Sequence, residues 1–262
     1  MSSNNILLVN IGNTSVCTAI GRGKIVSNSI RMQTSGCTPV SVKRQILRVV
    51  RKRSITDAVI CSVVPRLNAL WSREIQKALG RRPLLVGHKL KTGITLDYSK
   101  PATLGADRLA NVCGAGWLYG APVIVVDIGT AITFDVVTRD GRFIGGAIAP
   151  GPAMMADYMA ERTTLLPSIR IDGKCPKIGR NTVEAMQVGA LAGCRGMIRE
   201  IIGYLCTQNK LSRFKLVATG GWAGMICKGM NMPFIIDQEV TLQGMNRIYE
   251  LNKKDDGGRH DQ

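Results

Sequence analysis

The segment Val123–Val137 reads VIVVDIGTAITFDVV. Its first four residues predict a buried strand, and a second strand follows through Thr133, Phe134 and Val136. The tight turn between them carries a carboxylate, a glycine and a hydroxyl group (Asp127, Gly129 and Thr130). Glycine lets the backbone approach a ligand closely, while N–H groups and hydroxyls bind phosphate oxygens and an aspartate holds a cation beside them. Taken alone, the turn also fits an ordinary hairpin in which Asp and Thr satisfy the turn geometry.

The same pattern occurs a second time near the N-terminus. Leu8–Thr14 reads LVNIGNT and Val125–Ala131 reads VVDIGTA, and each is followed by another β run. A repeat this far apart predicts two similar lobes that begin with the same strand–turn–strand unit. Two phosphate-type turns on facing lobes would close on one nucleotide, which is an arrangement typical of a cleft enzyme.

Helical and strand patterns alternate along the rest of the chain and predict an α/β fold. We expect residues 1–118 to form an N-terminal lobe, residues 119–251 a C-terminal lobe, and residues 252–262 a disordered polar tail. Phe143–Gly151 is expected to be a strand that feeds a glycine-rich turn. In the predicted helix Val183–Leu205, three glycines suggest a closely packed face (Gly189, Gly193 and Gly196).

The composition is that of a globular protein. Of 262 residues, 45% are hydrophobic and 29 are glycine, and no apolar run approaches the length of a membrane span. The first residues lack the charged region of a signal peptide and pass directly into a strand, so we expect a cytoplasmic protein. The eight cysteines are scattered without metal-ligand spacing, which indicates small buried residues in a reducing compartment.

The formal net charge of +17 is typical of a protein that binds nucleic acid or an acidic membrane, or of one that acts on anionic substrates. Part of the excess lies in the predicted helix Val42–Arg53, where valines and an isoleucine form one face and lysines and arginines the other. Such a face is usually a solvated one. A nucleic-acid role is the other reading, but no recognised nucleic-acid motif accompanies the helix, which argues against it.

Asp107 begins a predicted helix after an irregular segment. An acidic residue at this position can be a helix cap. The functional alternative is a general base next to Arg108, a side chain suited to binding an anion.

Six motifs in order carry a family resemblance: Asn10-Ile-Gly-Asn-Thr, Gly105-Ala-Asp-Arg, Asp127-Ile-Gly-Thr-Ala-Ile-Thr, Gly145-Gly-Ala-Ile-Ala-Pro-Gly, Ile178-Gly-Arg-Asn-Thr and Thr219-Gly-Gly-Trp-Ala. From about Ile6 to Leu251, the chain resembles the type III pantothenate kinases of the acetate and sugar kinase, heat-shock ATPase and actin superfamily. The resemblance implies two ribonuclease-H-like lobes with a nucleotide cleft between them. It also implies ATP-dependent phosphorylation of pantothenate to 4'-phosphopantothenate in coenzyme A biosynthesis, by a homodimer without a membrane or nucleic-acid partner.

The resemblance assigns roles to particular residues. Asp107 would be the base for the pantothenate hydroxyl, and Asp127 would bind a monovalent cation, K⁺ or NH₄⁺. The substrate site would comprise Tyr98, Gly105, Ala106, Asp107, Arg108 and Thr182. The ATP phosphates, with Mg²⁺, would be held by Thr130 and the first turn: Asn10, Ile11, Gly12, Asn13, Thr14, Ser15, Val16 and Cys17.

One position departs from the family pattern. The family has aspartate where this chain has Asn10, and asparagine keeps an oxygen ligand but loses the charge that divalent cations prefer. The chain is then a working enzyme whose magnesium is held mainly by ATP, a weakened enzyme, or a paralogue without catalysis. The last reading leads to the alternative function, a basic regulatory protein that binds nucleic acid or a partner.

Overall fold

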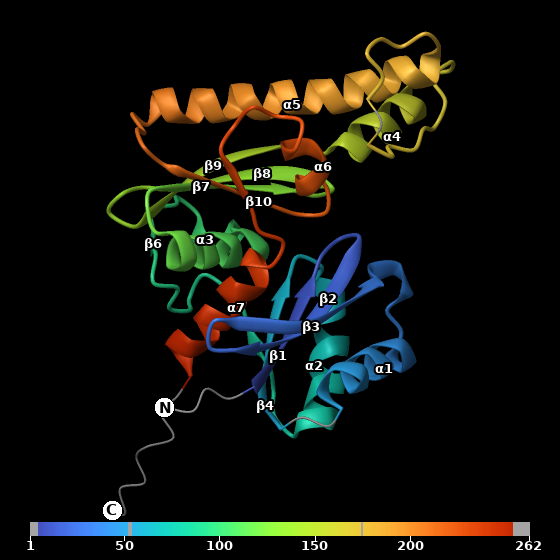
Figure 1. The fold of residues 1–262 in the computed structure, drawn as a ribbon. Helices are drawn as coiled ribbons and strands as arrows, with labels where there is room; N and C mark the ends of the chain where they lie inside the picture. The colour runs from blue at the N-terminus through green and yellow to red at the C-terminus, as the bar shows by residue number, and fades with distance from the viewer. Residues whose placement is uncertain (1–4, 52–53, 174, 254–262) are drawn as a thin grey trace, which may run out of the picture. The chain divides into compact units, whose positions relative to one another are not determined.

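The computed structural model describes residues 5–51, 54–173 and 175–253, and the chain divides into two compact units (Figure 1). Unit 1 comprises Met1–Thr95, Lys100–Trp117 and Thr241–Gln262, and unit 2 comprises Leu96–Ser99 and Leu118–Val240. Each unit is built on its own sheet.

The sheet of unit 1 has the strand order β3-β2-β1-β4-β5. Its strands are β1 (Asn5–Ile11), β2 (Ser15–Arg22), β3 (Ile25–Gln33), β4 (Ile55–Ser62) and β5 (Leu84–Leu85). The first three form an antiparallel meander, while β4 pairs in parallel with β1 and β5 in parallel with β4. Apolar, buried side chains run without interruption from Ile6 to Val9 of β1, as expected of a strand whose two faces are both covered.

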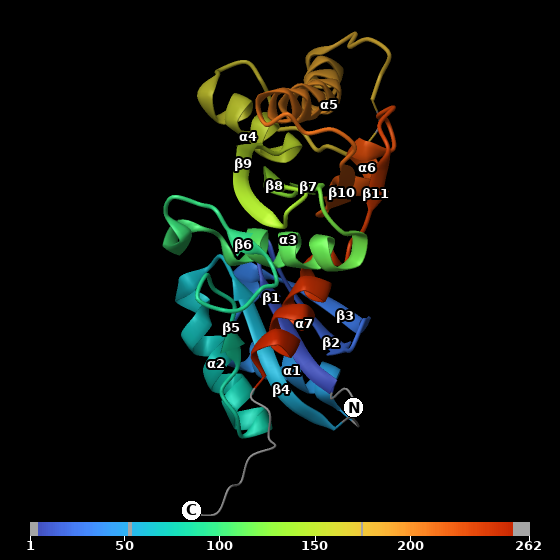
Figure 2. The ribbon, with the colours of Figure 1, turned by 90° about the vertical axis from the view of Figure 1, so that its left-hand side faces the viewer.

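Helices cover both faces of this sheet (Figure 2). The α1 helix (Pro39–Val50) and α2 helix (Pro65–Leu79) pack their buried residues on Leu7, Val9 and Ile11 of β1. Toward the other face lie α3 (Ala106–Tyr119) and α7 (Val240–Asn252). There, Gly244 of α7 lies so close to the Ala110 carbonyl of α3 that an added Cβ would overlap it.

The sheet of unit 2 repeats the same topology, in the order β11-β10-β7-β8-β9-β6. Its strands are β6 (Thr95–Leu96), β7 (Val123–Ile128), β8 (Ala131–Val137), β9 (Arg142–Pro150), β10 (Lys215–Thr219) and β11 (Phe234–Ile236). An antiparallel meander, β7-β8-β9, again has two parallel strands beside its first member. The duplication predicted from the two turns is therefore confirmed at the level of strand order.

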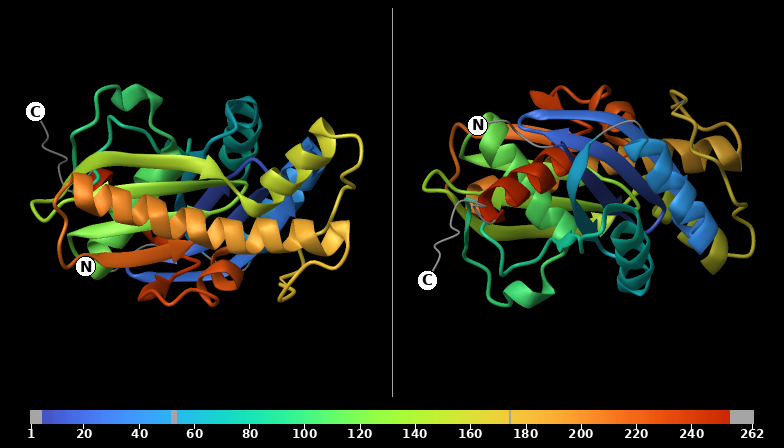
Figure 3. Two further views of the ribbon diagram at one scale, coloured as in Figure 1. Left: turned by 90° about the horizontal axis from the view of Figure 1, so that it is seen from above. Right: turned by 90° about the horizontal axis from the view of Figure 1, so that it is seen from below.

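The long α5 helix (Thr182–Gln208) lies along the unit 2 sheet (Figure 3). Its buried side chains, among them Leu191, Cys194 and Ile198, pack on Ile132, Phe134 and other residues of the sheet. The shorter helices are α4 (Pro152–Arg162) and α6 (Ala223–Cys227), and two 3₁₀ turns occur at Thr34–Gly36 and Pro101–Thr103.

The division into units differs from the predicted boundaries at two places. The α7 helix groups with unit 1, because its side chains contact that unit: the Tyr249 hydroxyl donates to Asp57 (2.7 Å), and Asn252 donates to the Lys91 carbonyl (2.7 Å). Leu96–Ser99 groups with unit 2, because the Asp97 N–H donates to the Phe143 carbonyl (2.9 Å). Of the predicted disordered tail, Asn252 ends α7, and residues 254–262 lie outside the described residues.

One expectation about glycines agrees with the structure and another is corrected. Residues 143–150 lie within β9, and Gly151 leads into α4; inside β9, a Cβ on Gly146 would overlap the Phe134 carbonyl of β8. On α5, an added Cβ at Gly189, Gly193 or Gly196 would meet no described atom within 4 Å. These three glycines therefore do not form a closely packed face within their own chain.

The cysteines behave largely as predicted. Five of the eight are buried, namely Cys17, Cys61, Cys113, Cys194 and Cys227. Burial raises the pKa of Cys113 to about 12 and that of Cys194 and Cys227 to about 11, so these thiols stay protonated and act as small core side chains. Among the described residues, no helix combines the length and the hydrophobicity needed to cross a bilayer.

Candidate active site

The first phosphate-type turn joins β1 to β2 through Gly12, Asn13 and Thr14. The Gly12 N–H donates to the Ser15 carbonyl (3.0 Å), which closes the turn. Thr34, directly after β3, stabilises the turn through two hydrogen bonds. Its hydroxyl donates to the Gly12 carbonyl (2.7 Å) and its N–H to the Thr14 carbonyl (3.0 Å). The turn is thus held in one shape while Asn13 and Thr14 stay exposed.

The residues predicted to bind ATP in this turn differ in how far their side chains are buried. The side chains of Ile11, Val16 and Cys17 are buried in the unit 1 core, so only their backbone could meet a nucleotide. Asn10 is half-buried at the end of β1, opposite Cys17 of β2 and Cys61 of β4.

The second turn joins β7 to β8 through Gly129 and Thr130, and it is one residue shorter than the first. Asp127 lies at the equivalent place to Asn10, next to Thr133 of β8 and Thr219 of β10. The Gly129 N–H donates to the Ala131 carbonyl (3.0 Å). The half-buried Asp127 and the exposed Thr130 therefore sit on a closed, rigid loop.

Two glycines allow other chain segments to reach this turn. Gly151, the N-cap of α4, donates its N–H to the Thr130 carbonyl (3.0 Å), and a Cβ there would overlap the Gly129 carbonyl. Gly220, which follows β10 with φ of +91°, lies where a Cβ would overlap the Asp127 carboxylate and approach the Ile128 carbonyl to 2.6 Å. The start of α4 thus packs on the turn itself, while the residue that follows β10 packs on the Asp127 carboxylate.

The residues around Asp127 fit a cation that takes part of its coordination from a bound ligand. No group of three histidine, cysteine, aspartate or glutamate side chains able to hold a metal occurs within residues 5–51, 54–173 and 175–253. A cation next to phosphates takes part of its oxygen coordination from the phosphates themselves, so a single carboxylate suits such a cation. The Asp127 carboxylate occupies the space that a side chain at position 220 would need.

Asp107 and Arg108 lie in the first turn of α3, in unit 1. The Arg108 N–H donates to the Asp107 carboxylate (2.7 Å). Burial raises the pKa of Asp107 above its ordinary value, although the Arg108 N–H and the Arg108 charge both lower it. A partly buried carboxylate with a raised pKa is a stronger base than an exposed one, which suits removal of a hydroxyl proton. Gly105 permits this arrangement, since a Cβ there would lie 2.6 Å from the carboxylate.

The two remaining predicted substrate residues lie in unit 2. Tyr98 packs on the Phe143 ring, with centroids 5.7 Å apart, and an added Cβ on Gly145 would be 3.4 Å from its ring. Thr182 is exposed at the start of α5, directly after the N-cap Asn181, whose side chain accepts from the Glu184 N–H (2.9 Å).

Comparison with known proteins is decisive for the family. The sequence model described as type III pantothenate kinase matches residues 6–203. A type III pantothenate kinase of Finegoldia magna is 37% identical over 258 residues, which cover 95% of this chain and 98% of the relative. One of Dehalococcoides mccartyi is 36% identical over 257 residues, covering 96% and 99%. The chain belongs to the type III pantothenate kinase family.

The solved structures that resemble this type III pantothenate kinase family member support the fold assignment. A Baf family protein from Campylobacter jejuni matches with a TM-score of 0.58 at 19% identity, over 94% of this chain and 98% of the other. A ROK hexokinase from Thermus thermophilus matches with a TM-score of 0.52 at 11% identity, over 93% and 98%. The two-lobe, actin-like ATPase fold predicted from the sequence is therefore confirmed.

The predicted site residues are divided between the two units. Unit 1 holds the turn Asn10–Cys17 and the helix start Gly105–Arg108, and unit 2 holds Tyr98, Asp127, Thr130 and Thr182. One buried acid escaped the sequence analysis: Asp135 of β8 is fully buried, and the Thr133 hydroxyl donates to it (3.2 Å). The sequence does show that Asp135 lies within the otherwise largely apolar run Ala131–Val137, and this pattern indicates a buried acid.

Proposed function

We propose that this chain transfers the γ-phosphate of ATP to the hydroxyl group of pantothenate, which forms 4'-phosphopantothenate and ADP in the first step of coenzyme A biosynthesis. The observation that carries the proposal is the family match over residues 6–203, together with two phosphate-type turns and an acid of raised pKa. The alternative of a non-catalytic regulatory protein is not favoured by the family membership.

In this proposal Asp107 accepts the proton of the pantothenate hydroxyl as its oxygen attacks the γ-phosphorus and the bond to ADP breaks. The Arg108 side chain, which is almost wholly buried, is suited to the anionic substrate, with Tyr98, Gly105, Ala106 and Thr182 as further substrate residues. The rate then depends on placing the hydroxyl oxygen within reach of the base and the phosphorus.

The phosphates of ATP are assigned to the two turns. Glycine-containing turns with fixed hydrogen bonds offer N–H groups and hydroxyls at Gly12–Ser15 and at Thr130. Asp127 is assigned to the monovalent cation, K⁺ or NH₄⁺, and Mg²⁺ is assigned to the phosphates with Asn10 nearby. Both cations would supply positive charge against the phosphate oxygens.

We further propose a homodimer, on the basis of an apolar surface of unit 2. The end of β9 and residues of α4 and α5 line a hollow of about 470 Å³, namely Pro150, Met154, Met155, Tyr158, Met159, Gly189 and Ala190. Tyr158 is exposed beside it, and the open glycines of α5 leave room for close approach by a second copy. The cytoplasmic location stays a prediction of the sequence.

The test is a coupled assay of ADP formation that requires pantothenate, run in potassium and in sodium buffers of equal ionic strength. We expect pantothenate-dependent turnover with Mg²⁺ and a sharp fall when sodium replaces potassium. Asp127→Asn should remove the difference between the two buffers, while Asp140→Asn, an exposed acid of the β8–β9 hairpin, should leave it unchanged. No turnover under any of these conditions would contradict the proposed function, and equal rates in both buffers would contradict the cation site alone.

A further inference from the structure

The solvent-facing side of α1 carries both positive charge and exposed aliphatic groups. The apolar residues Val42, Ile46 and Val49 anchor the helix in the core. On the other side, Val40 is 67% exposed and Leu47 is 46% exposed. Lys43, Arg44, Arg48 and Arg51 lie around them. We call these six residues the α1 face.

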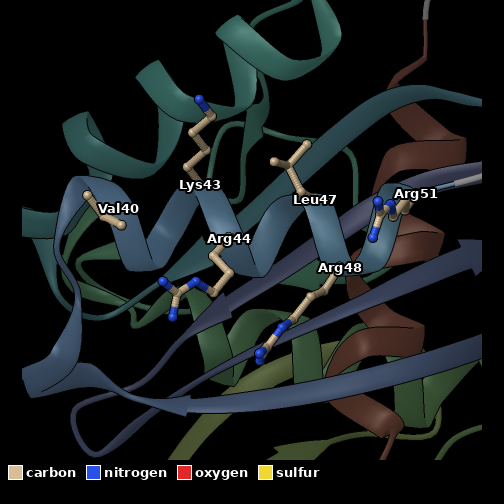
Figure 4. Close-up of a pocket in the computed structure, with 6 residues that line it drawn as sticks. All are labelled: Val40, Lys43, Arg44, Leu47, Arg48 and Arg51. Carbon is tan, nitrogen blue, oxygen red and sulfur yellow. The ribbon is translucent and has the colours of Figure 1, made fainter.

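Two hollows lie along the α1 face. The six residues line a hollow of about 560 Å³ (Figure 4). Val40, Lys43 and Leu47 also line a second hollow of about 420 Å³ against α2, with Arg73 and Lys77 at its edge. In Figure 4, Lys43 and Leu47 point to one side of the helix, while Arg44 and Arg48 point to the other. The face is therefore a ridge with aliphatic groups, flanked by cations.

The charge of this face is not neutralised within unit 1. On α2, Glu74 pairs with both Arg73 (3.1 Å) and Lys77 (3.0 Å). For Lys43, Arg44, Arg48 and Arg51, by contrast, the part of the chain that the structure describes supplies no ion pair. Four cations within one short helical surface attract a partner of opposite charge.

We propose that the α1 face docks an acidic amphipathic helix of a partner protein. Val40 and Leu47 are seven residues apart, about 10 Å along the helix axis, which is the spacing of apolar residues at i and i+7 on a second helix. Arg44 and Arg48 are about 6 Å apart along the axis, the spacing of carboxylates at i and i+4. Both periods of the face thus match one helical partner.

Other occupants match the face less well. Nucleic acid would use the cations, but single strands also require aromatic platforms, and none of the six residues is aromatic. A second copy of this chain would bring the same cations against themselves. An anionic membrane surface would also use the cations, but the hollow between α1 and α2 would add little to the binding of a flat surface. A helix with an apolar stripe would contact both the cations and the exposed Val40 and Leu47.

The experiment measures fluorescence anisotropy with a labelled synthetic helix of the repeat Leu-Glu-Glu-Leu-Ala-Glu-Glu. A control peptide has the same composition but leucines spread around all sides. Full-length wild-type protein should bind the amphipathic peptide about tenfold more tightly than the control peptide, since the stripe adds apolar contact worth about 1.4 kcal/mol. Affinity should fall as salt rises, because the pairs are exposed.

Three variants localise the binding. Arg44→Glu with Arg48→Glu should weaken it about tenfold or more, because attraction becomes repulsion at two positions. Leu47→Ser should remove the preference for the amphipathic peptide. The matched control, Arg139→Glu with Arg199→Glu, makes the same charge change at exposed arginines of unit 2 and should bind like wild type. Thermal melting and unchanged pantothenate turnover would establish that all the variants are folded.

The proposal is overturned if the double α1 variant binds like the unit 2 control, or if Leu47→Ser changes nothing. Two further probes test the other occupants. Tighter binding of a single-stranded oligonucleotide than of the amphipathic peptide, at the same salt, would identify a nucleic-acid surface instead. Tighter binding to vesicles containing phosphatidylserine would identify a membrane surface, and either result would refute the helix proposal.

Discussion

At the scale of single residues, Asp107 carries the most direct prediction. Asp107→Asn keeps an oxygen that can accept the Arg108 N–H but loses the base, so kcat should fall about 10²–10⁴-fold. A helix cap would behave differently, because replacing it lowers stability and leaves turnover nearly unchanged. Steady-state kinetics and thermal melting of wild type and variant separate the two roles.

The pH dependence of stability and of turnover provides a control for the role of Asp107. Burial raises the pKa of Asp107, so its proton is bound more tightly in the folded chain than in the unfolded one. The folded state is therefore disfavoured as pH rises through the window between the unfolded and the folded pKa, and at neutral pH the asparagine variant should be at least as stable as wild type. Turnover of wild type should fall as the pH is lowered through the folded pKa. A variant that loses stability but keeps kcat would leave Asp107 as a cap only.

Asn10 is the residue at which this chain departs from the family pattern. It lies half-buried at the place equivalent to Asp127, one in each repeat. If Asn10 is a tolerated ligand, Asn10→Asp should restore the missing charge, lower the Mg²⁺ concentration needed for half-maximal rate and raise kcat.

Magnesium titrations of wild type and Asn10→Asp measure this effect. An active wild type whose magnesium requirement and rate do not change on reversion would show that this position does not govern metal placement. An inactive wild type that the reversion fails to rescue would favour the reading of a lineage without catalysis.

At the scale of elements, the second turn depends on the absence of a side chain at Gly220. Gly220→Ala places a Cβ on the Asp127 carboxylate and forces alanine into a positive φ, so we expect a loss of about 1–3 kcal/mol in the free energy of unfolding. The neighbouring Gly221→Ala is the matched control, because its Cβ would meet nothing within 4 Å. Denaturant unfolding of both variants tests this, and equal stabilities would show that the turn yields without strain.

The elements themselves were largely predictable, because apolar periodicity and glycine-rich turns reflect local geometry. Such patterns predict the first two strands of each meander, the amphipathic α1 helix and the long α5 helix. What was missed depends on contacts between distant segments. β6 and β11 are only two and three residues long, too short for a sequence pattern, and they form strands because they pair with neighbouring strands of the unit 2 sheet.

The candidate site was predictable to a different degree. The turns around Asn10 and Asp127 could be located from the repeat, since a repeated motif marks equivalent positions. The family resemblance assigns a role to a position but does not show whether its side chain is buried. It therefore could not separate the buried Ile11, Val16 and Cys17 from the exposed residues of the turn. Asp135 was missed because its burial depends on what covers the sheet.

At the scale of the whole molecule, the return of the chain to unit 1 through α7 makes a prediction about Gly244. Gly244→Ala should lower the free energy of unfolding by about 1–3 kcal/mol, because the new methyl group overlaps the Ala110 carbonyl of α3. The same change on α5, Gly203→Ala, meets no atom and should raise it by about 0.5–1 kcal/mol through helix propensity.

Opposite signs for one chemical change would establish that α7 is packed as an integral part of unit 1. Equal effects of the two substitutions, measured by denaturant unfolding, would contradict that packing.

The path of the chain also has a consequence for synthesis on the ribosome. Residues 118–240 of unit 2 emerge as one uninterrupted stretch, whereas unit 1 is begun first and lacks α7 until residues 240–252 are made. The half that is started earliest is therefore finished latest. Until residues 240–252 have emerged, the surfaces that α7 covers on α3 and the first sheet stay open to water and to chaperones, and the docking of α7 is the event that completes the N-terminal half.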